Sequence, residues 1–257
     1  MDNELHPQVI AAAKRLRRTP QVLAFSCGAD SVASLVRMQQ WGMKPELLYL
    51  YFIPDLPMVE SYLRYVEDKI GQRVHRLPSK LAMEYLVNGV LQKPGIGEWI
   101  YKHCAKSDIG IPDSTDINEY FLECFPENTH VAVGLRVSDG IFRARKLKEQ
   151  GVIHPGRPEW YPVADCFQSD IVRIIENAGW KLPVDYRLFG RSFESIRHWS
   201  APPIRERCPR TWKRICEVFP MAPLLCAQEA MLPKSHSIKA RITAFSHLAF
   251  TTEDCNG

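Results

Sequence analysis

Short, continuous apolar runs recur along the first part of the chain. They occupy Val22–Phe25, Leu47–Ile53 and His130–Leu135, and a shorter strand is expected around Arg73–Leu77. Continuous runs of four to eight such residues are typical of strands buried on both faces of a parallel sheet. The longest run has seven residues, whereas a bilayer span needs roughly 18 to 20, so we expect no membrane partner.

Between these runs, apolar residues recur at helical spacing. The pattern predicts helices at 5–18, after Ser31 through Met38 with an end near Gly42, at 58–70 and at 170–178. Strands separated by helices favour right-handed crossovers. We therefore predict an α/β fold with a doubly wound, mostly parallel sheet, which binds ligands at the carboxyl ends of its strands.

The net charge of +4 is unevenly distributed. Residues 187–214 contain eight Lys or Arg and two Glu, so this segment carries +6 and the remainder −2. We expect a nucleotide-binding α/β domain at 1–186 and a basic C-terminal extension at 187–257, which is rich in Pro and Arg and then helical. The basic residues of 187–214 form either a docking surface for nucleic acid or a protein, or a solvated face with local ion pairs. Its interleaved aromatic residues fit packing better than base stacking.

Cysteine usage and the N-terminal residues favour a cytoplasmic protein. The eight cysteines are scattered singly in a long chain, which favours reduced thiols over a disulfide framework. No Cys-x-x-Cys pair occurs, so we expect neither an iron–sulfur cluster nor a metal site with that spacing. The first residues are acidic and polar, unlike a secretory signal.

The hexapeptide Ser26–Ser31 (Ser-Cys-Gly-Ala-Asp-Ser) joins the first predicted strand to the next helix. Small residues at a helix start leave backbone N–H groups free to bind an anion, which the helix dipole also favours. Asp30 either caps this helix or orients a metal or reacting group. Cys27 is either a small space-filling residue or a thiol activated by the helix N-terminus.

In this position the hexapeptide resembles the PP-loop, Ser-Gly-Gly-x-Asp-Ser, of the adenine nucleotide α-hydrolase-like superfamily, with Cys27 in place of the first glycine. Three further segments follow in the order found in its phosphoadenosine phosphosulfate (PAPS) reductase-like family. They are Gly134-Leu135-Arg136 with basic residues after it, Pro162 to Val172, and Leu182 to Gly190. The resemblance covers roughly residues 20–190.

The resemblance implies an adenine nucleotide along the carboxyl edge of the sheet, with its base near the main chain of Tyr51 and Phe52 and Arg136 on the distal phosphate or sulfate. Lys106 matches a Cys-x-x-Lys-like segment beginning at His103-Cys104 only loosely. The implied nucleotide-binding residues are Ser26, Gly28, Ala29, Asp30, Ser31, Tyr51, Phe52, Gly134, Arg136 and Arg143. The implied catalytic residues are Asp30, Arg136 and Cys255.

Three functions follow from this. The first is an enzyme that acts on ATP at the α-phosphate and releases pyrophosphate through an adenylylated intermediate, with Mg²⁺ as a candidate cofactor. The second is a PAPS reductase that releases sulfite, with Cys255 as nucleophile and a thioredoxin-like reductant. Glu253-Asp254-Cys255 lacks the Gly-x-His that follows the reductase cysteine, so the first is preferred. The third is a non-catalytic nucleotide-binding module that docks nucleic acid or a protein through Arg187–Arg214.

Overall fold

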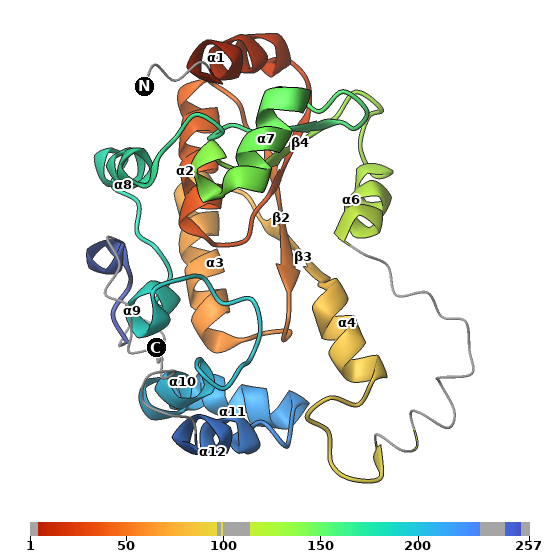
Figure 1. Ribbon diagram of the computed structural model, residues 1–257, viewed down its shortest axis with the longest axis vertical. Helices are drawn as coiled ribbons and strands as arrows, with labels where there is room; N and C mark the ends of the chain where they lie inside the picture. Colours follow the sequence, from red (N-terminus) through yellow and green to blue (C-terminus); the bar gives the residue numbers. More distant parts are fainter. Residues whose placement is uncertain (1–4, 97–98, 100–113, 232–244, 253–257) are drawn as a thin grey trace. The chain divides into compact units, whose positions relative to one another are not determined.

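The computed structural model describes residues 5–96, 99, 114–231 and 245–252. Five parallel strands form one sheet with helices around it, which confirms the predicted α/β class (Figure 1). The sheet order is β3-β2-β1-β4-β5. The strands are β1 (Gln21–Ala24), β2 (Glu46–Tyr51), β3 (Val74–Pro78), β4 (His130–Val133) and β5 (Glu159–Trp160).

The helices agree with the sequence pattern where that pattern is strongly periodic. The helix predicted at 58–70 is α3, and Gly71 ends it with a φ of 71°. None of the described helices is both long and apolar enough to cross a membrane. The helices are α1 (Leu5–Leu16), α2 (Ala29–Gln40), α3 (Pro57–Ile70), α4 (Lys80–Val87), α6 (Ser114–Leu122), α7 (Ile141–Gln150), α8 (Gln168–Asn177), α9 (Asp185–Phe189), α10 (Ala201–Arg207), α11 (Pro209–Val218) and α12 (Pro223–Met231), with short 3₁₀ turns η1 (Val137–Asp139) and η2 (Ser246–Leu248).

The strand order reverses beside β1. From β1 the chain builds outward through β2 to β3, and then returns to place β4 on the other side of β1. Strand β1 is parallel to both neighbours, with Leu23 opposite Leu47 in β2 and Ala132 in β4. In open α/β sheets, ligands bind at such a reversal, outside the carboxyl ends of the strands. The segments that follow β1 and β4 are therefore the first place to look for a site.

The chain divides into two compact units. The first comprises residues 1–49, 72–75 and 119–182. Its core includes Leu23, Ala132 and Trp160, which are fully buried, and α2 packs against α8. Burial of these apolar side chains is the main term that stabilises this unit.

The second unit comprises residues 50–71, 76–118 and 183–257, so the whole basic segment belongs to it, together with two earlier stretches of chain. Phe52 stacks on Phe219 with ring centres 5.3 Å apart, and Tyr85 packs edge-on against Phe52 at 5.0 Å. The Thr211 hydroxyl of α11 accepts a hydrogen bond from the Met58 amide of α3 at 3.2 Å. An aromatic cluster therefore holds α4 and α11 together.

Candidate functional site

The turn between β1 and α2 has the form of an anion cradle. Gly28 is the N-cap of α2 and supplies no capping side chain. The Ser31 hydroxyl donates to the Gly28 carbonyl at 2.8 Å, and the Gly28 amide donates to the Ser26 hydroxyl at 3.3 Å. Ser26 is exposed whereas Ser31 is buried, and the Ser26 hydroxyl donates to the Ser31 hydroxyl at 3.4 Å. The first amides of α2 remain at a helix N-terminus, where an anion is stabilised.

Cys27 has a strained backbone in this turn. Its φ of 60° lies in the left-handed region, which costs a residue with a side chain about 1–2 kcal/mol. The residue is buried, at 4% exposure. The backbone conformation therefore explains why a glycine suits this position, and why Cys27 departs from the pattern only at an energetic cost.

We expect the Cys27→Gly variant to be more stable than Cys27→Ala by about 1 kcal/mol, because both lose the thiol and only glycine relieves the left-handed strain. At ordinary helical positions glycine is the less stable of the two by about 0.5–1 kcal/mol. Urea denaturation of the two variants measures the difference. An alanine variant at least as stable as the glycine variant would contradict the assignment of strain.

Gly134, directly after β4, lets the second segment approach the cradle. A Cβ at this position would lie 2.9 Å from the Asp30 carbonyl carbon and 3.0 Å from the Ser31 nitrogen. Both atoms are backbone and neither can swing aside. The end of β4 therefore contacts the first turn of α2, as the strand reversal requires.

The Gly134→Ala substitution is expected to destabilise the protein by about 1–3 kcal/mol, because the methyl group must push β4 and α2 apart. Gly156→Ala is a matched control in the same unit. Its Cβ would meet only the His154 ring, at 3.9 Å. Thermal or urea unfolding compares the two, and equal effects would refute the close approach.

Arg136 lies at the centre of a chain of charges beside the cradle. Its Nε is 2.9 Å from Asp30 Oδ1, and its terminal nitrogen is 2.7 Å from Asp139 Oδ1. Arg143 of α7 pairs with Asp139 Oδ2 at 2.8 Å. The Arg136 side chain is 15% exposed and that of Arg143 is 55% exposed. The structure thus brings Asp30, Gly134, Arg136 and Arg143 together, with Asp139 as the carboxylate between the two arginines.

Asp30 is easily protonated for a carboxyl group. Burial raises its pKa to about 6, and Asp139 adds to this, although Arg136 acts in the opposite direction. A raised pKa means that the surrounding protein stabilises the charged carboxylate less well than water does. An added cation or a proton would therefore be favoured at Asp30, and a perturbed carboxyl in such a position is typical of functional sites.

We expect the Asp30→Asn variant to gain stability relative to the wild type as pH rises. The folded-state pKa of Asp30 lies above the ordinary value of 3.8. Protonation of Asp30 therefore stabilises the wild type fully below pH 3.8, and this contribution is lost as pH rises through about 6. The difference should grow by up to about 2 kcal/mol between pH 4 and 7. Chemical denaturation at a series of pH values measures it, and a constant difference would contradict the raised pKa.

A second cluster in the first unit, which the sequence pattern does not predict as a functional group, joins the buried Arg37 and Asp165 to the exposed His6. Arg37 of α2 contacts both oxygens of Asp165, at 2.5 and 3.3 Å, and His6 bonds Asp165 at 2.6 Å. Burial alone would raise the pKa of Asp165, but hydrogen bonds from Arg37 hold it below its usual value. Burial raises the pKa of the neighbouring Cys166 thiol to about 12, so this thiol stays protonated. The cluster fastens α2, whose N-terminus is the cradle.

Other sequence-predicted residues have different surroundings. In the second unit, the Tyr51 carbonyl accepts the Ser79 amide at 2.8 Å, and the Phe52 ring belongs to the aromatic cluster. Both features are structural, and the prediction that this main chain holds a base remains a prediction. Cys255, Lys106 and Cys104 lie outside the described residues.

The basic segment is folded into α9, α10 and α11, and several of its arginines contact groups of the same unit. Arg187 donates to the carbonyls of Ala249 and Phe250, and Arg214 donates to the Pro54 carbonyl. Phe189 and Phe193 are each 5% exposed, which confirms packing for these two aromatic residues.

In the described part of the chain, no group of three or more His, Cys, Asp or Glu side chains is arranged to hold a metal by itself. Mg²⁺ commonly uses only one or two carboxylates when phosphates supply further ligands, so Asp30 suits a metal that arrives with a nucleotide, whereas both oxygens of Asp139 already contact arginines. Comparison with known proteins adds no family: no protein-family model matches the chain, and no curated protein is detectably similar to it.

Proposed function

We propose that this chain is an adenine-nucleotide enzyme similar to the PAPS reductase-like family, which acts on ATP at the α-phosphate and releases pyrophosphate. The observation that carries the proposal is the meeting of the β1 turn with the β4 turn at the strand reversal, where Arg136 lies 2.9 Å from Asp30. A phosphate cradle and an arginine that converge on one edge suit a polyphosphate.

In this proposal the amides of the first turn of α2 and the Ser26 hydroxyl donate hydrogen bonds to phosphate oxygens. Arg136 exchanges its contact with Asp30 for the pyrophosphate leaving group, whose developing charge its guanidinium stabilises. Asp139 keeps the guanidinium aligned through its 2.7 Å contact. Mg²⁺, when bound with ATP, would be held by Asp30 and would neutralise phosphate charge.

The test is pyrophosphate release from ATP with water as the acceptor, which yields AMP and pyrophosphate by cleavage of the bond between the α- and β-phosphates. We expect release by the wild type and its loss in Asp30→Ala. Arg145→Gln is the control, because Arg145 lies on the exposed side of α7 and pairs with Glu149. Release that persists in Asp30→Ala, or no release at all, would contradict the proposal.

The same assay with PAPS distinguishes the reductase alternative. Sulfite released with a thiol donor, and abolished by Cys255→Ser, would replace the ATP-cleaving proposal with the reductase. Nucleotide binding without either product would support the non-catalytic module.

A further inference from the structure

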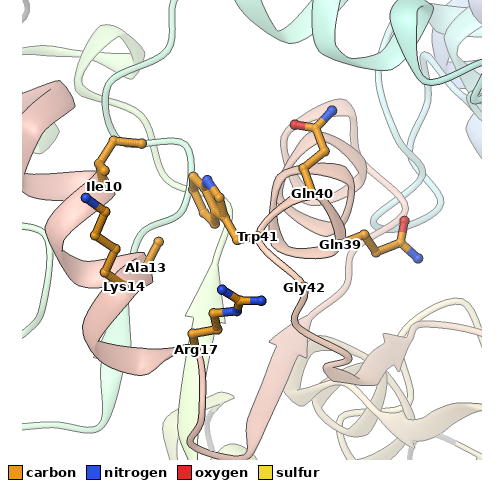
Figure 2. Close-up of a pocket in the computed structure, with 8 residues that line it drawn as sticks. All are labelled: Ile10, Ala13, Lys14, Arg17, Gln39, Gln40, Trp41 and Gly42. Carbon is orange, nitrogen blue, oxygen red and sulfur yellow. The ribbon is translucent and has the colours of Figure 1, made fainter.

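A second candidate site lies at the opposite end of α2 from the cradle, within the first unit. A cavity of about 360 Å³ lies between the end of α1 and the end of α2 (Figure 2). Its volume is at the small end of the range for small-molecule sites, about 300–1,000 Å³. Helix α2 has 12 residues and is therefore about 18 Å long, so the cavity and the cradle are separate. The lining residues are Ile10, Ala13, Lys14, Arg17, Gln39, Gln40, Trp41 and Gly42.

Two cations belong to this lining, and no carboxylate does. Lys14 and Arg17 are both exposed, and among the described residues neither has a carboxylate within 4.0 Å. A cation in the last turn of a helix is often explained by the helix dipole. Arg17, however, lies beyond the end of α1 at Leu16, and Figure 2 shows its guanidinium extending toward Trp41 and Gly42.

The backbone at Gly42 leaves room for this guanidinium. Gly42 has a φ of 75°, and a Cβ there would lie 3.2 Å from a terminal nitrogen of Arg17. A side chain at position 42 would therefore be strained and would also crowd Arg17. The turn that ends α2 thus leaves room for one cation of the cavity.

Trp41 lines the cavity, and its indole ring contacts two buried side chains. The Arg37 guanidinium lies 4.8 Å from its ring centre, and the Trp160 ring is 6.0 Å away. Arg37 is in turn held by the buried Asp165. Figure 2 shows the indole between the α1 side chains and the two glutamines, whose amides can donate and accept hydrogen bonds.

We propose that this cavity binds a small phosphate monoester that carries an aromatic ring. The ring packs on Trp41 and the phosphate binds Lys14 and Arg17. A dianion matches two cations that lack a carboxylate partner, and Arg favours phosphate through its planar fork. The indole supplies the apolar contact that a phosphate ion alone would not use.

Titration of the full-length protein with phenyl phosphate, followed by calorimetry, tests the proposal. We expect a dissociation constant of about 1 mM or below, and weaker binding of inorganic phosphate and of phenol. The double variant Lys14→Gln, Arg17→Gln should weaken phenyl phosphate binding about tenfold or more, since it removes two charge-assisted contacts. The matched control is Arg15→Gln, Arg18→Gln, which removes two exposed cations next to the same residues but outside the lining. It should change affinity less than about twofold.

Three results would overturn the proposal. Equal losses of phenyl phosphate affinity in the two double variants would indicate that the anion is attracted non-specifically to the basic surface. Weaker phenyl phosphate binding by Ser26→Ala, with unchanged binding by the Lys14→Gln, Arg17→Gln variant, would mean that phenyl phosphate occupies the cradle. Absence of phenyl phosphate binding by the wild type would remove the site.

Discussion

Replacement of Asp165 by asparagine is expected to lower the free energy of unfolding at pH 7 by about 3–5 kcal/mol. The Asp165 side chain is 4% exposed and that of Arg37 is 10% exposed. Loss of the carboxylate leaves a buried guanidinium without a compensating charge, and desolvation of that charge dominates the cost. Because the pKa of Asp165 lies below its usual value, its stabilising contribution is fully present at pH 7 and is lost only as pH falls through the folded-state pKa.

Urea denaturation of two further variants makes this test specific. Glu149→Gln breaks the exposed pair with Arg145 in the same unit and should cost less than about 0.5 kcal/mol. The double variant Arg37→Met, Asp165→Asn should lose less free energy of unfolding than the two single variants lose together, because it leaves no buried charge unpaired. A cost for Asp165→Asn within about 1 kcal/mol of zero would show that the cluster does not fasten α2.

Replacement of Arg136 by glutamine should slow pyrophosphate release from ATP about 10²–10³-fold. The loss reflects removal of a positioned cation from the charge that develops on the leaving phosphates, an effect comparable with loss of a transition-state donor. Lysine at this position should restore part of the rate, because it keeps the charge but not the fork that contacts Asp30 and Asp139 together.

Arg145→Gln again serves as the control for this rate, and unfolding curves show whether Arg136→Gln remains folded. A rate in Arg136→Gln within about threefold of the wild type would exclude Arg136 from the chemistry, whatever the identity of the acceptor.

Local pattern was sufficient to predict β1, α2, α3 and the turn between β1 and α2, because continuous apolar runs and helical periodicity depend only on neighbouring residues. It was insufficient for β5, which has two residues, and for α7, whose residues are mainly charged and show little apolar periodicity. The element boundaries moved by one or two residues. Helix α1, for example, ends at Leu16 rather than at residue 18.

The candidate site was predictable only in part, for a related reason. Resemblance to the PP-loop family, together with position after buried strands, indicated Asp30, Gly134 and Arg136, but spacing cannot reveal that Asp30 pairs with a residue 106 positions away. The Arg37 and Asp165 pair is separated by 128 residues, and its sequence signal is only a charge within an apolar helix face. The cavity at Trp41 likewise forms from the ends of two helices whose facing sides cannot be read from either sequence segment.

The most direct test of the central claim, that an adenine nucleotide binds at the strand reversal, is thermal unfolding of the full-length protein with ATP, AMP, PAPS and adenosine 3′,5′-bisphosphate. A ligand that binds the folded state raises the melting temperature by an amount that grows with the ratio of its concentration to its dissociation constant. We predict a larger rise with ATP than with AMP, since only ATP carries the phosphates that reach Arg136, and a much smaller ATP effect in Arg136→Gln. An unchanged melting temperature with all four nucleotides would contradict it.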